Sequence, residues 1–234
     1  MGTRGGTGRT AGGRRGPGRP RRPLDAEGIL AAAIAIADRE GLDAVSIRRI
    51  AAALDARPMS IYDHFDSKDD LLSAMADRIL AELLVPGASA GDWREAVRAL
   101  AHRNYALFLS HPWYVILFGR RPVWGPNALA VAVQAAHAFD PLPLDPDLRW
   151  TLLGTVLDYV LGYSLRVIAS PAPEAFGELL SGAELARRPE LASLPPNMRS
   201  RTSVERFEAG LELVLDGVEQ RLEGGGAGPG AGAS

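Results

Sequence analysis

Apolar residues recur every three or four positions along most of the chain, which is the spacing of amphipathic α-helices. No run of alternating β-branched residues indicates a strand, so we predict an all-α fold. In the first half, the pattern predicts helices over residues 26–40, 47–54, 58–65 and 68–84. Asp25, Ser46 and Ser67 stand where N-caps are expected. Gly41 follows the first helix, where a glycine commonly ends one.

The second half continues the helical pattern in longer elements. Asp92, with Glu95 three positions later, predicts a capping box. The helices expected there cover residues 93–110, 113–118, 125–139, 147–169, a weak one near 174–187, and a last one from the cap Thr202/Glu205 to 223. Helix 147–169 is apolar over a membrane-spanning length, but Asp158 and Arg166 would be costly at bilayer depth. We therefore interpret it as a core helix of a soluble protein and expect no membrane partner.

The two ends of the chain break the helical pattern. Residues 1–23 are rich in glycine, arginine and proline, and 224–234 are mostly glycine and alanine. Neither segment can offset its ordering entropy, so we expect both to be disordered. The first contains seven arginines and no acid, whereas the rest of the chain holds 19 basic and 28 acidic residues, a balance of −9. A basic arm before an acidic body favours a polyanion partner.

The residue types that carry chemistry are scarce. The chain has no cysteine, which excludes disulfides and thiolate catalysis and fits a reducing cytoplasm. Its four histidines form no HExxH pattern, and there is no GxSxG or glycine-rich loop opening a helix. An arginine-rich start before the apolar residues 29–37 imitates a signal peptide, but acidic residues flank that segment on both sides. We therefore expect a cytoplasmic non-enzyme with no metal and no cofactor.

The helices over 47–54 and 58–65 are short and separated by a tight turn, which is the spacing of a helix-turn-helix. Ile61 and Phe65, at i and i+4, lie on one face of the second helix and can pack against Ile50 of the first. A helix anchored on one face can enter the DNA major groove with its other faces. The alternative is that the outward residues form an ordinary solvated surface with no role in DNA binding.

The outward residues are of the types that contact DNA. Hydroxyls, histidine, lysine and helix N-termini bind phosphate, and arginine binds phosphate or guanine. Lys68 opens a helix, where its charge opposes the helix dipole, so a bound phosphate explains it better than helix stability does. The candidate DNA-contact residues are Ser46, Arg48, Arg57, Pro58, Met59, Ser60, Tyr62, His64 and Lys68.

The segments REGLDAVSIRRIAAAL (39–54) and RPMSIYDHFDSKDDLL (57–72) resemble the DNA-binding domain of TetR-type transcriptional repressors. The residues that match the family pattern are Gly41, Ser46, Tyr62, His64, Phe65 and Lys68. Asp55 departs from it, since the family usually has glycine in the turn. Aspartate tolerates the left-handed conformation better than most residues, so we expect the turn to be kept.

The resemblance implies a three-helix DNA-binding domain with a helix-turn-helix (24–84), followed by a larger helical ligand-binding and dimerisation domain (85–223). The last segment, 206–222, resembles the closing helix of the subgroup related to the tetracycline repressor. The dimer is expected to form through 147–169 and 204–222, with the alternative that these helices only cover the core of one chain. Aromatic residues, and polar residues within helices that otherwise read as buried, are pocket candidates. Those chosen are His102, Asn104, Tyr105, Phe108, Trp113 and Asp158.

These expectations combine into a ligand-responsive transcriptional regulator, most simply a repressor. It would bind a near-palindromic double-stranded operator as a homodimer and be released by a small-molecule effector. The basic arm would add contacts to phosphates or the minor groove. The alternative is a small-molecule-binding or enzymatic helical protein whose N-terminal bundle is purely structural.

Overall fold

The computed structural model describes residues 24–85, 91–120, 124–169, 187 and 203–225. Within those ranges every regular element is a helix, which confirms the all-α fold. The predicted arm (1–23) and, apart from Arg187, the weak helix near 174–187 lie outside the described residues. Residues 224 and 225 belong to the last helix, and the rest of the predicted tail (226–234) lies outside the described residues.

The first helices form where the sequence places their caps. They are α1 (Ala26–Glu40), α2 (Ile47–Ala53), α3 (Met59–Tyr62) and α4 (Lys68–Leu80), with 3-10 turns η1 (Leu42–Ala44) and η2 (Ala81–Leu83). The side chains of Asp25, Ser46 and Ser67 each accept a hydrogen bond from a first-turn amide of the following helix, at 2.8, 3.2 and 3.0 Å. Gly41 ends α1 at φ 85°, a conformation that favours glycine.

The turn between α2 and α3 keeps the expected geometry. Asp55 adopts φ 50°, so the left-handed residue needed there is supplied without glycine. The third helix is shorter than the predicted 58–65, because α3 ends at Tyr62. The residues after it must turn the chain toward Ser67, whose extended backbone caps α4.

The second set of helices is longer. It consists of α5 (Trp93–Ser110), α6 (Pro112–Arg120), α7 (Pro126–His137), α8 (Pro146–Ala169) and α12 (Ser203–Gly225). The predicted capping box is only half formed. Asp92 caps α5 through the Arg94 amide at 2.9 Å, but the Glu95 carboxylate pairs with Arg98 at 2.7 Å rather than returning to the cap.

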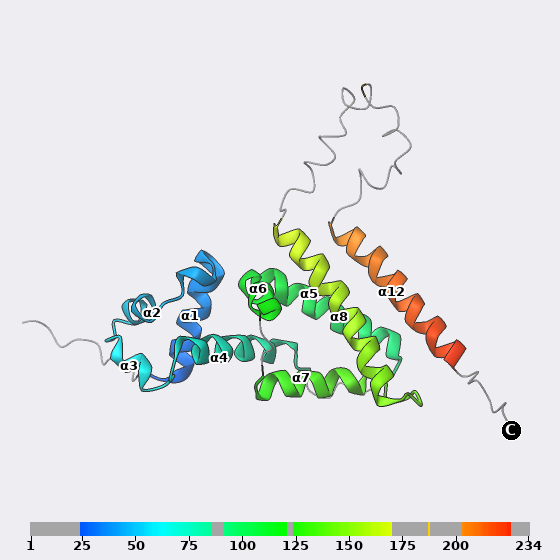
Figure 1. Ribbon diagram of the computed structural model, residues 1–234, viewed down its shortest axis with the longest axis horizontal. Helices are drawn as coiled ribbons and strands as arrows, with labels where there is room; N and C mark the ends of the chain where they lie inside the picture. Colours follow the sequence, from blue (N-terminus) through cyan, green and yellow to red (C-terminus); the bar gives the residue numbers. More distant parts are fainter. Residues whose placement is uncertain (1–23, 86–90, 121–123, 170–186, 188–202, 226–234) are drawn as a thin grey trace, which may run out of the picture.

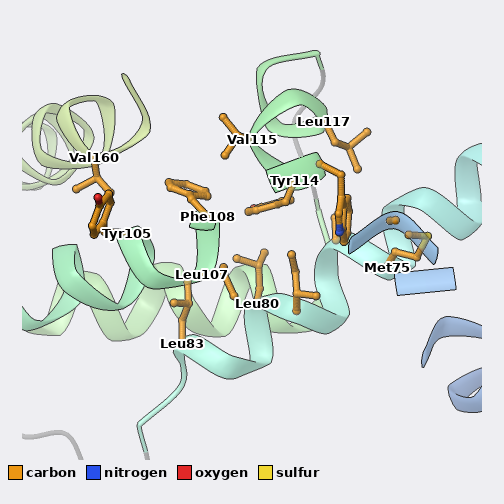
Figure 2. Close-up of a cluster of buried hydrophobic side chains, with 14 of the residues drawn as sticks. Met75, Leu80, Leu83, Tyr105, Leu107, Phe108, Tyr114, Val115, Leu117 and Val160 are labelled. Carbon is orange, nitrogen blue, oxygen red and sulfur yellow. The ribbon is translucent and has the colours of Figure 1, made fainter. Parts of the chain in front are cut away.

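The helices are arranged so that α4 links two groups (Figure 1). At one end, α1, α2 and α3 form the small N-terminal bundle, and α4 runs from it toward α5, α6 and α7. Figure 2 shows Leu80 and Leu83 of this linking segment beside Phe108 and Tyr114. The two domains therefore share one continuous buried core.

Helix α8 is long and apolar enough to cross a membrane by length and composition alone. It packs against α5, α6, α7 and α12, and buries Leu152, Val156 and Val160 within the protein. This packing favours the interpretation of α8 as a core helix.

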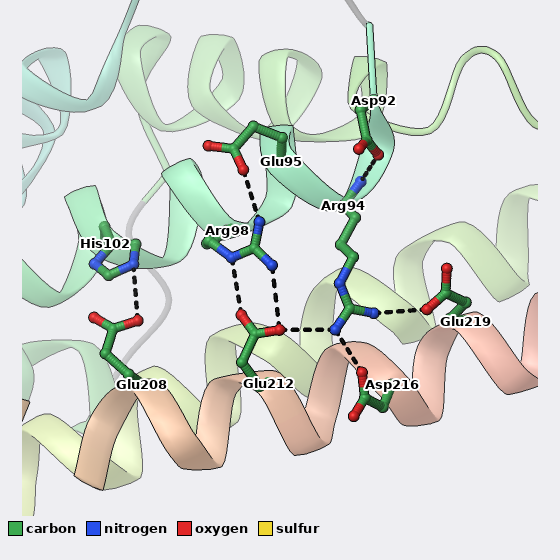
Figure 3. Close-up of polar contacts among 9 residues, drawn as sticks. All are labelled: Asp92, Arg94, Glu95, Arg98, His102, Glu208, Glu212, Asp216 and Glu219. Atoms are coloured by element: carbon green, nitrogen blue, oxygen red, sulfur yellow. Dashed lines mark hydrogen bonds and ion pairs between the residues drawn. The ribbon is translucent and has the colours of Figure 1, made fainter. Parts of the chain in front are cut away.

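Helix α12 is held to α5 by charge as well as by apolar packing (Figure 3). The Arg94 guanidinium lies 2.8 Å from Glu212, 2.5 Å from Asp216 and 2.8 Å from Glu219. Arg98 also pairs with Glu212, at 2.9 Å. The two arginines, Arg98 foremost, lower the pKa of Glu212 to about 2.

Candidate DNA-contact surface and ligand cavity

The short helix α3 is held by its inner face. Ile61 is fully buried and Phe65 is 6% exposed, and both belong to the core that includes Ile50 of α2. Each fully buried side chain of this size contributes roughly 1.5–3 kcal/mol relative to its exposed state. Four helical residues have little stability alone, so this anchor fixes the direction of α3.

The predicted DNA-contact residues lie on one exposed surface, which we call the recognition surface. Met59 is 71% exposed and Tyr62 is 46% exposed, although both are large and partly apolar. Ser60 is half-buried. The others, all exposed, are Ser46, Arg48, Arg57, Pro58, His64 and Lys68. Exposed apolar bulk beside hydroxyl and basic groups is typical of a surface that is covered by a partner.

The charges around α3 are unevenly neutralised. Arg49 pairs with Glu40 at 2.8 Å, and this contact, more than the one from Arg39, lowers the pKa of Glu40. Arg48, Arg57 and Lys68 form no ion pair with any residue that the structure describes. These three charges therefore remain available to an anionic ligand such as the DNA backbone.

Two carboxylates connect the N-terminal bundle to the second domain. Asp38 of α1 accepts hydrogen bonds from His111 Nδ1 at 2.7 Å and from Trp113 Nε1 at 2.6 Å. Asp77 of α4 accepts from the amides of Asn127 and Ala128 at 3.4 and 2.9 Å, and so caps α7. Helices α6 and α7 are thus each fastened to a helix that positions α3.

A cavity of about 590 Å³ lies between these fastened helices and α8. Its walls come from α4, η2, α5, α6, α7 and α8, and most of the lining is apolar. The aromatic members of the lining are Phe108, Tyr114, Phe118, Trp124 and Trp150. This volume and composition are typical of a small-molecule site.

Few polar groups face the cavity. Asn104 lines it and donates its amide to the Leu100 carbonyl at 2.9 Å, inside its own helix. Tyr114 is 2% exposed, and its hydroxyl has no hydrogen-bond partner among the described residues. Burial, and then the nearby Asp77 carboxylate, raises the pKa of Tyr114, so the phenol stays neutral and can donate.

The structure brings only two of the six predicted pocket residues, Asn104 and Phe108, to this cavity. His102 instead lies 3.3 Å from Glu208 of α12 (Figure 3), and Tyr105 stacks on Phe207 with ring centroids 4.3 Å apart. Trp113 is engaged by Asp38. Asp158 points to the exposed side of α8. In each case, a partner on another helix or the solvent removes the side chain from the cavity.

The sequence pattern does not identify most of the residues that line the cavity. Tyr114 and Phe118 stand at i and i+4 on α6, which is a visible aromatic stripe, but it reads equally well as core. Trp124 and Trp150 come from separate elements and reach the lining only through the tertiary fold. Among the described residues, no cluster of three or more potential metal ligands occurs.

Helix α12, through which a dimer is expected to form, buries one of its faces within a single chain. Phe207, Leu211, Leu215 and Val218 are buried against α8 and α5. They cover the core of a single chain, as in the alternative reading. The residues of α8 and α12 that face outward are not those of this buried face.

Comparisons with known proteins agree with this architecture. Residues 29–75 match the model of bacterial regulatory proteins of the tetR family, and 85–222 match the tetracyclin repressor-like C-terminal domain. The HTH-type transcriptional repressor DrrR1 of Streptomyces coeruleorubidus is 32% identical over 225 residues, which cover 88% of this chain and 82% of its own. The tetracycline repressor protein class G of Vibrio anguillarum is 27% identical, over 84% of this chain and 94% of its own.

Solved structures give the same result. ActR from Streptomyces coelicolor in complex with actinorhodin superposes with a TM-score of 0.73 at 28% identity, over 89% of this chain and 99% of ActR. A helix-turn-helix with an exposed recognition surface and a helical domain with a cavity are thus found together in a chain that matches both family models. The chain belongs to the TetR family of bacterial transcriptional regulators and carries the tetracyclin repressor-like C-terminal domain.

Proposed function

We propose that this regulator is a homodimeric repressor that binds a near-palindromic operator through its recognition surface and is released when an effector occupies the cavity. The observation that carries the proposal is the anchored helix α3, with a buried inner face and with Met59 and Tyr62 exposed beside cations that form no ion pair with any described residue. We infer a cytoplasmic site of action, because the proposed partner is operator DNA.

The outward faces of α8 and α12 support a dimer. On α8, Thr155, Gly162 and Leu165 are exposed along one side, and Gly162 has open space around it. On α12, Leu213 is 73% exposed one turn before the exposed Gly217. Apolar and small residues on neighbouring helices permit close packing of a four-helix interface across a two-fold axis. Such a dimer would hold its two α3 helices about 34–36 Å apart, one DNA turn.

Effector release uses the connections between the domains. A ligand that spreads α6 and α7 would pull on Asp38 and Asp77, and so reorient α1 and α4 with the attached α3. The ligand would then shift the population toward a dimer whose recognition helices no longer match the operator spacing. ActR has been solved with actinorhodin and with (S)-DNPA, so a protein of similar fold does bind small molecules.

Selection from random duplex DNA tests the repressor proposal. The full-length chain should enrich a near-palindromic motif, and Tyr62→Ala should bind that motif about ten- to hundredfold more weakly. Arg57→Ala should also weaken binding and reduce the salt dependence by about one charge. Arg221→Ala on α12, an exposed arginine far from α3, is the matched control and should leave the affinity unchanged.

Two results would contradict the proposal. A pool that stays random at moderate salt would favour the alternative, in which the N-terminal bundle is only structural. Equal losses for Arg57→Ala and Arg221→Ala would mean that binding reads net charge rather than the recognition surface.

A further inference from the structure

Asp63 lies at the centre of the outward face of α3. The Phe65 amide donates to the Ile61 carbonyl at 3.1 Å, and Asp63 has helical angles, φ −69° and ψ −14°, so helical geometry continues through this residue. At about 100° per residue, Asp63 projects about 180° away from the direction that the buried anchors Ile61 and Phe65 share. Met59, four positions earlier, lies on the same side and is 71% exposed. Asp63 and Met59 therefore form the outermost ridge of α3, opposite its anchored face.

This ridge is the part of the recognition surface that would meet the bases. A helix in the major groove presents the side opposite its anchor to the base edges and its flanks to the two sugar-phosphate backbones. Tyr62 and His64 lie on these flanks, each about 100° around the helix axis from Asp63. Phosphate contacts of the flanks fix the register of the helix but carry no sequence information. The identity of the bases should therefore be read by the ridge.

The Asp63 carboxylate has no role within the protein that the structure shows. Asp63 is exposed, and its side chain forms no hydrogen bond or ion pair with any residue in the described ranges. The contact at the end of α3 uses its backbone amide, which donates to the Ile61 carbonyl. The residues that match the family pattern do not include Asp63, so the resemblance gives it no role either. Beside phosphates, a carboxylate without a counter-charge lowers affinity unless it accepts a hydrogen bond there.

The donors that bases present in the major groove are few. Guanine and thymine offer acceptors, which would repel a carboxylate, and adenine places its N7 acceptor beside its N6 amino group. Cytosine presents its N4 amino group as a donor with no acceptor of its own beside it. A carboxylate on the ridge is therefore complementary to cytosine.

We propose, on the basis of the operator binding proposed above, that Asp63 determines base specificity by accepting a hydrogen bond from the N4 amino group of one cytosine in each operator half-site. Because the dimer is two-fold symmetric, this cytosine should occur at the same position in both half-sites. The flanks and the unpaired cations would supply most of the affinity, and Asp63 would supply discrimination at this base pair.

A substitution scan of the selected operator tests this assignment. Each base pair of one half-site is replaced in turn, and binding to the full chain is measured by fluorescence anisotropy at fixed salt. At one C·G pair, every replacement should weaken binding by about tenfold. Replacing that cytosine with 2-pyrimidinone, which lacks the N4 amino group, should weaken binding by a similar factor.

Variants of Asp63 connect this base pair to the side chain. Asp63→Ala should bind all four base pairs at that position, and the 2-pyrimidinone duplex, with equal affinity. Asp63→Asn should prefer adenine there, because an amide pairs with adenine N6 and N7. Both variants should bind random duplex DNA at least as tightly as the parent chain, since they remove a negative charge near phosphates. Asp43→Asn, the same charge change at an exposed site in η1, is the matched control and should keep the preference for cytosine.

Two results would overturn the assignment while leaving the proposed operator binding intact. The first is a selected motif in which no cytosine position depends on Asp63. The second is a loss of affinity for specific and random DNA alike in Asp63→Ala, which would indicate a structural role. A pool that stays random would contradict the proposed operator binding itself, and the assignment with it.

Discussion

The recognition surface and the cavity are built in opposite ways. All residues of the recognition surface lie between Ser46 and Lys68, on two short helices and the start of a third. The cavity takes residues from Leu80 to Val160 and from six elements. The first depends on one helix being anchored at two positions, and the second depends on several long helices failing to fill the space between them.

This difference predicts different sensitivities. A well-packed anchor has no room to relax, so the loss of a ring leaves a new hole. A cavity wall already borders empty space, so the same loss removes fewer contacts. Matched substitutions in the two regions should therefore change the free energy of unfolding by unequal amounts. This arrangement suits a regulator, because its effector site can change shape without unfolding the anchor.

The largest effect is expected for Phe65→Ala, which should lower the free energy of unfolding by about 3–5 kcal/mol. Phe65 is buried in the core under α3. Phe118→Ala, on the half-buried cavity wall, should cost about half as much or less, because its ring already faces the cavity. Urea denaturation of both variants gives the comparison. Equal losses would mean that the cavity is closed or filled in solution.

The same difference explains what the sequence could predict. The caps, the left-handed Asp55 and the anchors Ile61 and Phe65 follow from local rules, and these features all appear in the fold. Helix lengths in the second domain were also close, because they depend on the periodicity of single segments. Helix α3 ends at Tyr62 rather than at the expected residue 65, since its end is set by the turn toward Ser67.

The cavity could not be predicted in the same way. Whether a helical aromatic residue faces a neighbour or an empty space depends on the neighbour, which lies far along the chain. Tyr105 and Phe108 are one turn apart on α5, yet Tyr105 meets α12 and Phe108 meets the cavity. The sequence predicts Trp113 as a pocket aromatic, but its indole donates a hydrogen bond to Asp38, 75 positions away.

The junction between the two regions should be the next most sensitive place. Asp38→Ala leaves His111 Nδ1 and Trp113 Nε1 without the acceptor they share, and both side chains are buried. We expect a loss of about 2 kcal/mol in the free energy of unfolding, because each unsatisfied buried donor costs about 1–3 kcal/mol and part is recovered by relaxation. Denaturation of this variant and of the exposed-site control Asp43→Ala measures that loss. If Asp38→Ala lowered the free energy of unfolding no more than the control does, the assigned hydrogen bonds would be contradicted.

A smaller effect, dependent on pH, is expected at the contact between α5 and α12. Glu212 has a pKa lowered to about 2, against an ordinary value of 4.5, because Arg98 and Arg94 favour its charged form. A lowered folded-state pKa stabilises the protein above pH 4.5, and this stabilisation is lost as the pH falls toward 2. The full shift corresponds to about 3 kcal/mol, but the Glu212 side chain is 40% exposed, so solvent screening leaves about 1 kcal/mol.

The variant Glu212→Gln isolates that contribution. At pH 7 the free energy of unfolding of this variant should be about 1 kcal/mol lower than that of the parent chain. The difference should shrink steadily between pH 4.5 and pH 2, where the parent carboxylate also becomes neutral. Thermal unfolding of both proteins at several pH values gives the curve. A difference that stays constant with pH would attribute the loss to packing rather than to charge.

The smallest expected change has the opposite sign. Gly154 lies within α8 on the cavity wall, and a Cβ placed there meets nothing within 4 Å. Gly154→Ala should therefore raise the free energy of unfolding by about 0.5–1 kcal/mol, through the lower entropy of the unfolded chain. The added methyl group would enter the cavity, and operator binding should stay unchanged.

Gly210→Ala on α12 is the counterpart, because a Cβ there would collide with the Tyr159 hydroxyl, which donates to the Phe207 carbonyl at 2.7 Å. That variant should lose stability instead of gaining it, since the collision displaces a hydrogen-bonded ring in a packed contact. Differential scanning calorimetry of the pair gives both signs in one experiment. Opposite shifts in melting temperature would establish that the space beside Gly154 is open in solution, and that the chain forgoes stability there to keep room for a ligand. Shifts of the same sign would place the empty volume elsewhere in the second domain.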